Sequence, residues 1–214
     1  MKSILLTGGA RSGKSHYAQE LALKSGKKVL FVATAEAGDE EMRQRIKDHQ
    51  RSRPPEWGTL EAAANVGKQI LKKEGGLTRH ASGDTKAGAP ARHSLDAGGE
   101  IIIVDCITML VNNVFSRYAD YTAEKIDAAK VDKEVTREIS ELIECLDRLD
   151  SGFIFVTNEV GMGLVPPNPI DRLYRDLLGK ANRMLAERVD EVYLMVAGLP
   201  VTIKSSGKYP PNPP

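Results

Sequence analysis

Eight residues near the start of the chain fit the pattern G-x-x-x-x-G-K-[ST] of a phosphate-binding loop. The apolar run at residues 4–6 before the loop predicts a short buried strand, and residues 15–24 after it predict a helix. This order presents backbone N–H groups to a polyphosphate, with Lys14 placed to reach the β- and γ-phosphates and Ser15 to bind Mg²⁺. A chance glycine turn is the alternative. The residues of this predicted nucleoside triphosphate site are Gly8, Gly9, Ala10, Arg11, Ser12, Gly13, Lys14 and Ser15.

A histidine surrounded by arginines is the second feature. Residues 39–50 predict a helix in which Met42, Ile46 and His49 are spaced by four and then three, so that they share one face. That face is expected to hold the histidine against the protein body. A neutral imidazole can attack phosphorus, and guanidinium groups can stabilise the charge that develops on phosphate oxygens. A histidine that only packs or caps the helix is the alternative that spacing leaves open. The neighbouring arginines are Arg45, Arg51 and Arg53.

The elements that must position these residues alternate between strands and helices. Strands are predicted at 28–33, 101–105, 153–157, 191–196 and 201–204. A further helix is predicted after Glu61, ending at about residue 73. Two more are predicted over 122–149 and from Asn168-Pro169 to about residue 189. This alternation predicts a P-loop NTPase-like α/β fold, in which helices flank a mainly parallel sheet.

Two segments lack the pattern of packed elements. Residues 75–99 are rich in glycine, alanine and small polar residues and predict a flexible surface loop. A metal site at His80 and His93 is one interpretation of that loop, and solvated histidines are the favoured one. Residues 205–214 are rich in proline and predict an extended or disordered tail. A single domain is therefore predicted over residues 1–204, with 75–99 as an insertion.

Composition narrows the class of protein. The 214 residues carry 30 basic and 29 acidic side chains, a net charge of +1, which does not favour nucleic acid as a partner. No apolar stretch is long enough to span a bilayer, and a signal peptide before the first strand is not expected. Cys106 and Cys145 form no C-x-x-C pair and are expected to be buried thiols. These features predict a cytoplasmic protein.

Several segments together resemble one family. They are Thr7–Ser15, Ala33-Thr34-Ala35, R-I-x-x-H-x-x-x-R-P at 45–54, Trp57, Glu61, V-D-C-x-T at 104–108, V-T-N-E-V-G-M-G-x-V-P at 156–166 and Y-R-D-x-x-G-x-A-N at 174–182. In these the chain is similar to the bifunctional adenosylcobinamide kinase / adenosylcobinamide-phosphate guanylyltransferases of cobalamin biosynthesis. The resemblance covers the chain apart from 75–99 and the tail. Its specificity comes from the histidine segment and T-N-E-V-G-M-G, because many nucleotidases share the phosphate loop.

The resemblance implies two successive reactions on a corrinoid side chain. A nucleoside triphosphate, ATP or GTP, phosphorylates the hydroxyl of the aminopropanol arm. GTP then loses pyrophosphate to form a guanylyl–histidine, by resemblance at His49, and the cobinamide phosphate takes up the GMP. Mg²⁺ as cofactor and a homotrimer are also implied.

The resemblance adds further site residues. Asp105 ends a buried strand and is placed as an acid that holds a metal-bound water, beside Ser15; a carboxylate that only caps a turn is the alternative. Residues implied to bind nucleotide are Ala33, Thr34, Ala35, Gln50, Arg51, Ser52, Arg53 and Glu61, for which exposed ends of elements are the alternative. The loop 158–166 is expected to be a mobile lid or a corrinoid contact, or else a mere connector.

Two rival functions explain less of the sequence. A P-loop kinase of another small molecule accounts for residues 8–15 and Asp105 but gives no reason for the His49 segment. A GTP-dependent switch reads guanine with an N-K-x-D stretch, which this chain lacks. The chain departs from the family pattern in the long segment 75–99 and at Met109-Leu110, where an aromatic residue often stands.

Overall fold

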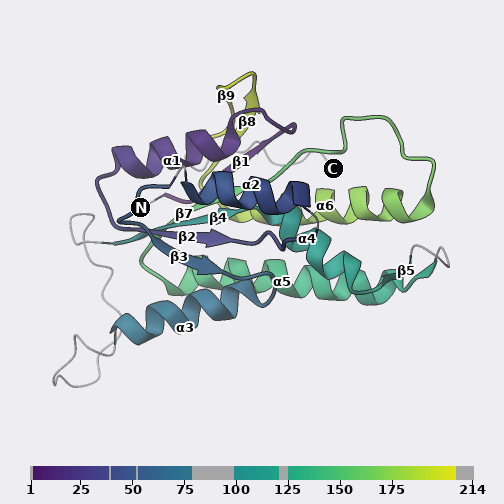
Figure 1. Ribbon diagram of the computed structural model, residues 1–214, viewed down its shortest axis with the longest axis horizontal. Coiled ribbons are helices and arrows are strands. Elements are labelled where there is room, and N and C mark those ends of the chain that lie inside the picture. The colour runs from purple at the N-terminus through teal and green to yellow at the C-terminus, as the bar shows by residue number, and fades with distance from the viewer. Residues whose placement is uncertain (1, 39, 52, 79–98, 121–124, 206–214) are drawn as a thin grey trace.

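A seven-stranded sheet forms the centre of the protein, in the order β3-β2-β4-β7-β1-β8-β9 (Figure 1). The structure is a computed structural model that describes residues 2–38, 40–51, 53–78, 99–120 and 125–205. Neighbouring strands are parallel except β8 and β9, which are antiparallel. The predicted α/β class with a mainly parallel sheet is confirmed. The strands are β1 (Ile4–Gly8), β2 (Val29–Ala33), β3 (Gly58–Glu61), β4 (Ile101–Asp105), β7 (Gly152–Val156), β8 (Glu191–Val196) and β9 (Leu199–Lys204).

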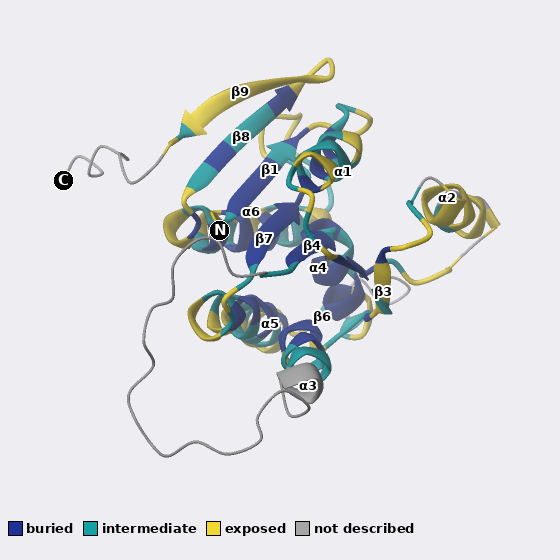
Figure 2. Cartoon of the chain, turned by 90° about the vertical axis from the view of Figure 1, so that its left-hand side faces the viewer, coloured by how far each residue is buried: buried dark blue, intermediate teal, exposed yellow. Residues whose placement is uncertain are grey.

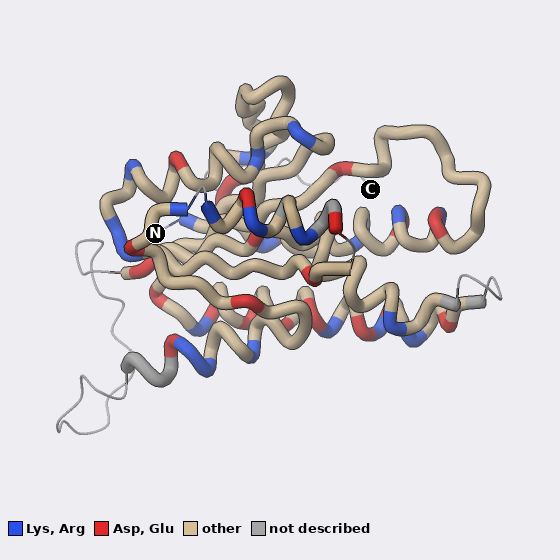
Figure 3. Tube along the Cα trace, viewed as in Figure 1, with Lys and Arg blue, Asp and Glu red and all other residues tan. Residues whose placement is uncertain are grey.

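Helices cover both faces of this sheet (Figure 1). One face packs against α3, α4, α5 and α6, around buried residues such as Phe115 and Phe153. The other face packs against α1 and Trp57. Residues of both charge signs are interspersed along the helices (Figure 3). The helices are α1 (Lys14–Lys24), α2 (Glu40–Arg51), α3 (Val66–Thr78), α4 (Ile107–Ser116), α5 (Ala128–Arg148) and α6 (Pro169–Arg188). Two short strands, β5 (Ala119–Asp120) and β6 (Lys125–Ile126), pair antiparallel in a second sheet.

Helix α2 stands apart from the body of the protein (Figure 2). Among its described side chains only that of Ile46 is half-buried, and His49 is exposed. Pairs within the helix stabilise it locally, such as Arg43 with Glu40 at 3.0 Å and Gln44 with Asp48 at 2.8 Å. The side chain of His49 is therefore less buried than the predicted packed face implies, although Ile46 and His49 do line the same cavity.

Three other elements differ from prediction. Helix α3 continues to Thr78, so the start of segment 75–99 is helical, while 79–98, with His80 and His93, lies outside the described residues. Helix α5 begins at residue 128 rather than 122, because the Asp127 side chain caps it by accepting a hydrogen bond from Lys130 N at 3.0 Å. Helix α4 was not predicted. The tail 206–214 also lies outside the described residues.

Candidate functional site

The turn between β1 and α1 has the geometry of a phosphate-binding loop. Gly8 has φ of 145° and Gly13 has φ of 90°, values that L side chains rarely adopt. A Cβ atom on Gly8 would also lie 2.5 Å from the carbonyl oxygen of Met195 on β8. No side chain caps the N-terminus of α1, and no acidic residue lies in its first turn. The N–H groups there are thus available to an anion.

Lys14 is buried inside this loop and bonds to it. Its Nζ donates to Gly9 O at 2.6 Å and to Gly8 O at 3.1 Å. Burial lowers the pKa of Lys14, and the nearby charges of Cys106 and Asp105 act against that shift. These contacts hold a positive charge within the loop, where a polyphosphate would need it.

Asp105 at the end of β4 is bonded to Ser15, and its second oxygen lacks a partner. The Ser15 side chain hydrogen-bonds the carboxyl group, while Oδ2 is buried with no hydrogen bond. Burial raises the pKa of Asp105, and the Ser15 bond and the charges of His49, Arg53 and Lys14 act against the rise. An orphaned carboxylate oxygen beside a hydroxyl fits Mg²⁺, which takes few protein ligands and completes its shell with phosphates and water. No cluster of three or more His, Cys, Asp or Glu able to hold a metal occurs in the described part of the chain.

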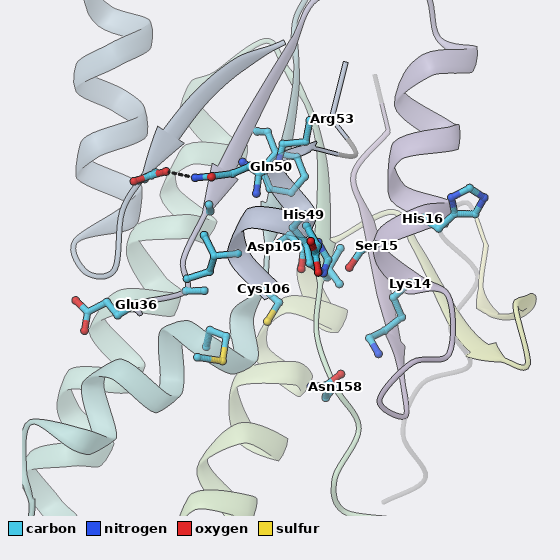
Figure 4. A pocket seen from close by; sticks show the side chains of 18 of the residues that line it. Lys14, Ser15, His16, Glu36, His49, Gln50, Arg53, Asp105, Cys106 and Asn158 are labelled. Atoms are coloured by element: carbon cyan, nitrogen blue, oxygen red, sulfur yellow. Dashed lines mark hydrogen bonds between the residues drawn. The ribbon is translucent and has the colours of Figure 1, made fainter. Parts of the chain in front are cut away.

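His49 comes from α2 and reaches the same place. Figure 4 shows its ring directed toward Asp105 and Ser15, and a charge on His49 is one of the influences that lower the pKa of Asp105. Its neighbour Gln50 donates from Nε2 to Glu61 Oε1 at 2.9 Å, a bond that links the end of α2 to the end of β3. The exposed α2 therefore presents one side of its last turn to the phosphate-binding loop.

Arg53 follows α2 and turns inward. Its guanidinium lies 3.8 Å from the centre of the Phe31 ring, and its Nε is buried without a hydrogen bond. Burial lowers the pKa of Arg53, while Asp105 and Glu61 act against the shift. A partly buried cation with spare hydrogen-bond donors is suited to phosphate oxygens.

Thr34 was predicted to bind nucleotide, but its side chain is bonded within the protein. Its side chain is buried, donates from Oγ1 to Cys106 O at 2.6 Å and accepts from Cys106 N at 2.8 Å. The Asn113 side chain in turn donates to Thr34 O at 2.7 Å. These hydrogen bonds connect the end of β2 to the residue that follows Asp105. The Thr34 side chain therefore supports the backbone of the site and is not among the residues that line the cavity.

A polar network fixes the chain where it leaves β7. Thr157 donates from Oγ1 to Asn182 Oδ1 at 2.7 Å, and Asn182 Nδ2 donates to Asn158 O at 3.0 Å. Asn158 N donates to Thr108 Oγ1 at 2.7 Å, and Glu159 N donates to Gly8 O at 3.0 Å. The segment T-N-E therefore connects α4, α6 and the phosphate-binding loop.

One cavity of about 950 Å³ joins these features (Figure 4). It brings together most of the predicted residues: Ala10, Arg11, Ser12, Gly13, Lys14, Ser15, Ala33, Ala35, His49, Gln50, Arg53, Glu61 and Asp105. Gly8 and Gly9 are not among the lining residues, but their carbonyl oxygens accept hydrogen bonds from Lys14. Arg51 is exposed, lies 3.9 Å from Asp48 and is not among the lining residues, and Ser52 lies outside the described residues.

Comparison with known proteins identifies the family. The model of the cobinamide kinase / cobinamide phosphate guanyltransferase family matches residues 4–80 and 85–203. The chain belongs to this family. The match is interrupted at residues 81–84, inside segment 75–99, and it ends before the tail.

Named relatives agree with this family assignment. The bifunctional adenosylcobalamin biosynthesis protein CobU of Salmonella typhimurium is 38% identical over 94% of this chain and 99% of its own length. CobU of Escherichia coli is 34% identical over the same shares, and CobP of Pseudomonas aeruginosa is 37% identical over 94% and 96%. Among solved structures, the RadB recombinase aligns at 17% identity with a TM-score of 0.44 over 90% of this chain and 73% of that chain, which is too distant to inform on function.

This member of the cobinamide kinase / cobinamide phosphate guanyltransferase family has lining residues that sequence reasoning missed. They are His16, Phe31, Glu36, Ala37, Asp48, Ala62, Ala63, Cys106, Met109 and Val156. One signal was present for Phe31, which is two residues before Ala33 on the same strand and so shares its face. Cys106 is half-buried at the cavity rather than buried in the core, whereas Cys145 is buried as expected; both thiols are free. No helix among the described residues could cross a bilayer.

Proposed function

We propose that this chain catalyses both reactions that its family name describes, at the single cavity between the phosphate-binding loop and α2. A nucleoside triphosphate phosphorylates the hydroxyl of the cobinamide arm, and GMP is then transferred from GTP to the phosphate so formed. The observation that carries the proposal is that His49 and Lys14 line one cavity although they belong to separate elements.

In the phosphorylation step, positioning and charge are the protein's contribution. The loop N–H groups and Lys14 bind the β- and γ-phosphates, which draws the Lys14 ammonium away from the carbonyls of Gly8 and Gly9. The Ser15 hydroxyl and the Asp105 carboxylate would hold Mg²⁺, directly or through water, and the ion would neutralise charge on the phosphate oxygens when bound. The oxygen of the cobinamide hydroxyl attacks the γ-phosphorus and gives up its proton to water, and the nucleoside diphosphate leaves with the electron pair of the broken P–O bond.

In the transfer step, His49 acts as the nucleophile. A ring nitrogen attacks the α-phosphorus of GTP, a P–N bond forms, and pyrophosphate leaves with the electron pair of the broken P–O bond. Arg53 lies beside this point and stabilises the charge on the phosphate oxygens. A phosphate oxygen of the cobinamide then attacks the same phosphorus, the P–N bond breaks, and His49 is released with GMP on the corrinoid.

A kinase of another small molecule remains the alternative, and the placement of His49 weighs against it. Such an enzyme would need only the phosphate-binding loop and Asp105, and it would gain nothing from a histidine directed at them across the cavity. The homotrimer implied by the family resemblance and the use of ATP or GTP in the first step stay predictions, to be checked by light scattering and by turnover with each nucleotide.

The test is the intact mass of the protein after incubation with GTP and Mg²⁺. We expect an acid-labile gain of one GMP in the parent and no gain in His49→Ala. His16→Ala is the matched control, because His16 also lines the cavity but lies on α1. It should keep the adduct. Cobinamide phosphorylation should persist in His49→Ala. An adduct that survives in His49→Ala would refute the assignment, and no adduct in any protein would leave only the kinase.

A further inference from the structure

The loop between β7 and α6, in which Asn158 lines the cavity, exposes apolar side chains further along the chain. Met162, Leu164 and Val165 are 79%, 95% and 67% exposed. Residues 160–167 carry no charged side chain, and Figure 3 shows the course of the loop toward α6 in the colour of uncharged residues. Grouped apolar side chains on a surface mark a place where another molecule binds.

Hydrogen bonds to α4 and α6 hold both ends of this loop. Asn158 lines the cavity and is held by the hydrogen bond of its N–H to Thr108 Oγ1. At the far end, the Arg172 side chain donates to Pro166 O at 2.9 Å. Met162 is four residues beyond Asn158, at most about 13 Å of extended chain. The apolar segment therefore continues directly from the wall of the cavity.

The size of the cavity decides what can lie inside it. Its volume of about 950 Å³ is at the upper end of the range for a single drug-sized ligand. A nucleoside triphosphate bound to Lys14 and reaching Arg53 takes up much of that space. A corrin ring is larger than the nucleotide, and only its hydroxyl arm has to meet the phosphates. The ring must then rest outside, where the cavity opens.

We infer that residues 162–165 form the surface on which the corrin ring of the substrate docks, with its arm entering the cavity past Asn158. This inference rests on the proposed function. The ring is broad and carries methyl groups on its faces and edges, so it matches a surface of uncharged side chains better than the charged groups on α2. The exposed apolar side chains of the loop are covered when the ring binds, which favours binding.

The test compares two sets of variants in the full chain. Met162→Ser combined with Leu164→Ser removes the apolar surface and, since both side chains are exposed, leaves the core intact. Leu23→Ser is the matched control. Leu23 is 53% exposed and lies on the last turn of α1, nine residues from Lys14, or about 14 Å along the helix. Cobinamide binding is measured by equilibrium dialysis, followed by the colour of the corrinoid, and the KM values for cobinamide and GTP are measured in turnover.

We expect the double variant to bind cobinamide about ten-fold more weakly, with a matching rise in its KM. Its KM for GTP and its GMP adduct should match those of the parent and of Leu23→Ser. Unchanged cobinamide binding would overturn the inference. A changed oligomeric state with unchanged cobinamide binding would overturn it in favour of a second copy on this surface. Because dialysis needs no turnover, failure of the proposed catalysis and failure of this surface give different results.

Discussion

The proposed role of the Asp105 carboxyl group is to bind Mg²⁺, directly or through water. The group is bonded to Ser15, and its buried Oδ2 has no hydrogen-bond partner. We expect Asp105→Asn to raise the Mg²⁺ concentration needed for half-maximal GMP adduct formation by about 10- to 100-fold, because an amide is a weaker partner for the ion or its water. The measurement is a Mg²⁺ titration of adduct formation.

Asp48→Asn is the control for that titration, because this carboxylate also lines the cavity but is exposed on α2. An equal shift in both variants would mean that general negative charge, and not the position of Asp105, attracts the ion.

Thr34 shows what sequence reasoning cannot decide for a single residue. Its place just past a strand end correctly indicated the edge of the sheet where ligands bind. Whether a side chain there faces the ligand or the protein depends on the neighbouring strand. Here Cys106 follows the neighbouring strand β4, and its backbone both accepts a hydrogen bond from the Thr34 hydroxyl and donates one to it. That pairing joins residues far apart in the chain, so no local pattern reveals it.

At the scale of elements, the sequence predicted those helices, strands and loops whose own residues carry a recognisable motif. The phosphate-binding loop, the strand 101–105 and the start of α6 at Asn168-Pro169 carry their own motifs, and the structure confirms each as an element. Helix α4 has no such signal, because Cys106 provides no side-chain cap and the helix is apolar on most of its surface. The lining residues Ala62 and Ala63 were missed for a related reason, since they follow β3, a short strand that is mostly exposed.

The exposure of helix α2 predicts that this helix opens locally more often than the rest of the protein. Its described side chains are exposed except Ile46, yet it carries His49 and Gln50 into the site. Few buried contacts predict easy local opening. We expect the amides of residues 40–51 to exchange hydrogen faster than those of α5 in the free protein, and to become more slowly exchanging when GTP bridges Lys14 and His49.

The measurement is hydrogen exchange followed by mass spectrometry, with α5 as the internal reference because it has a buried face in the core. Protection of residues 40–51 equal to that of α5 before GTP is added would contradict the expectation. The helix would then be held by contacts that its exposure does not indicate.

At the scale of the whole molecule, charge repulsion near segment 79–98 makes stability depend on pH. Glu74 on α3 lies against Glu100, the residue before β4. Burial, the charge of Glu100 and a hydrogen bond with it raise the pKa of Glu74 to about 7 from 4.5, while Lys73 acts against the shift. A carboxyl group with a raised pKa binds more protons in the folded state. Its contribution to stability is therefore full below about pH 4.5 and is lost as the pH rises through about 7.

Glu74→Gln removes the titrating group and the repulsion together. We expect the free energy of unfolding of the parent to fall by roughly 1–2 kcal/mol between about pH 5.5 and pH 8 from this pair, a value reduced for the partial exposure of Glu74. The variant should lack that fall and be the more stable protein at the higher pH. Urea unfolding at the two pH values measures this, with the exposed Glu56→Gln as control. The same pH dependence in the parent and in Glu74→Gln would show that the carboxyl pair does not control it, and that the ends of α3 and β4 meet without a shared proton.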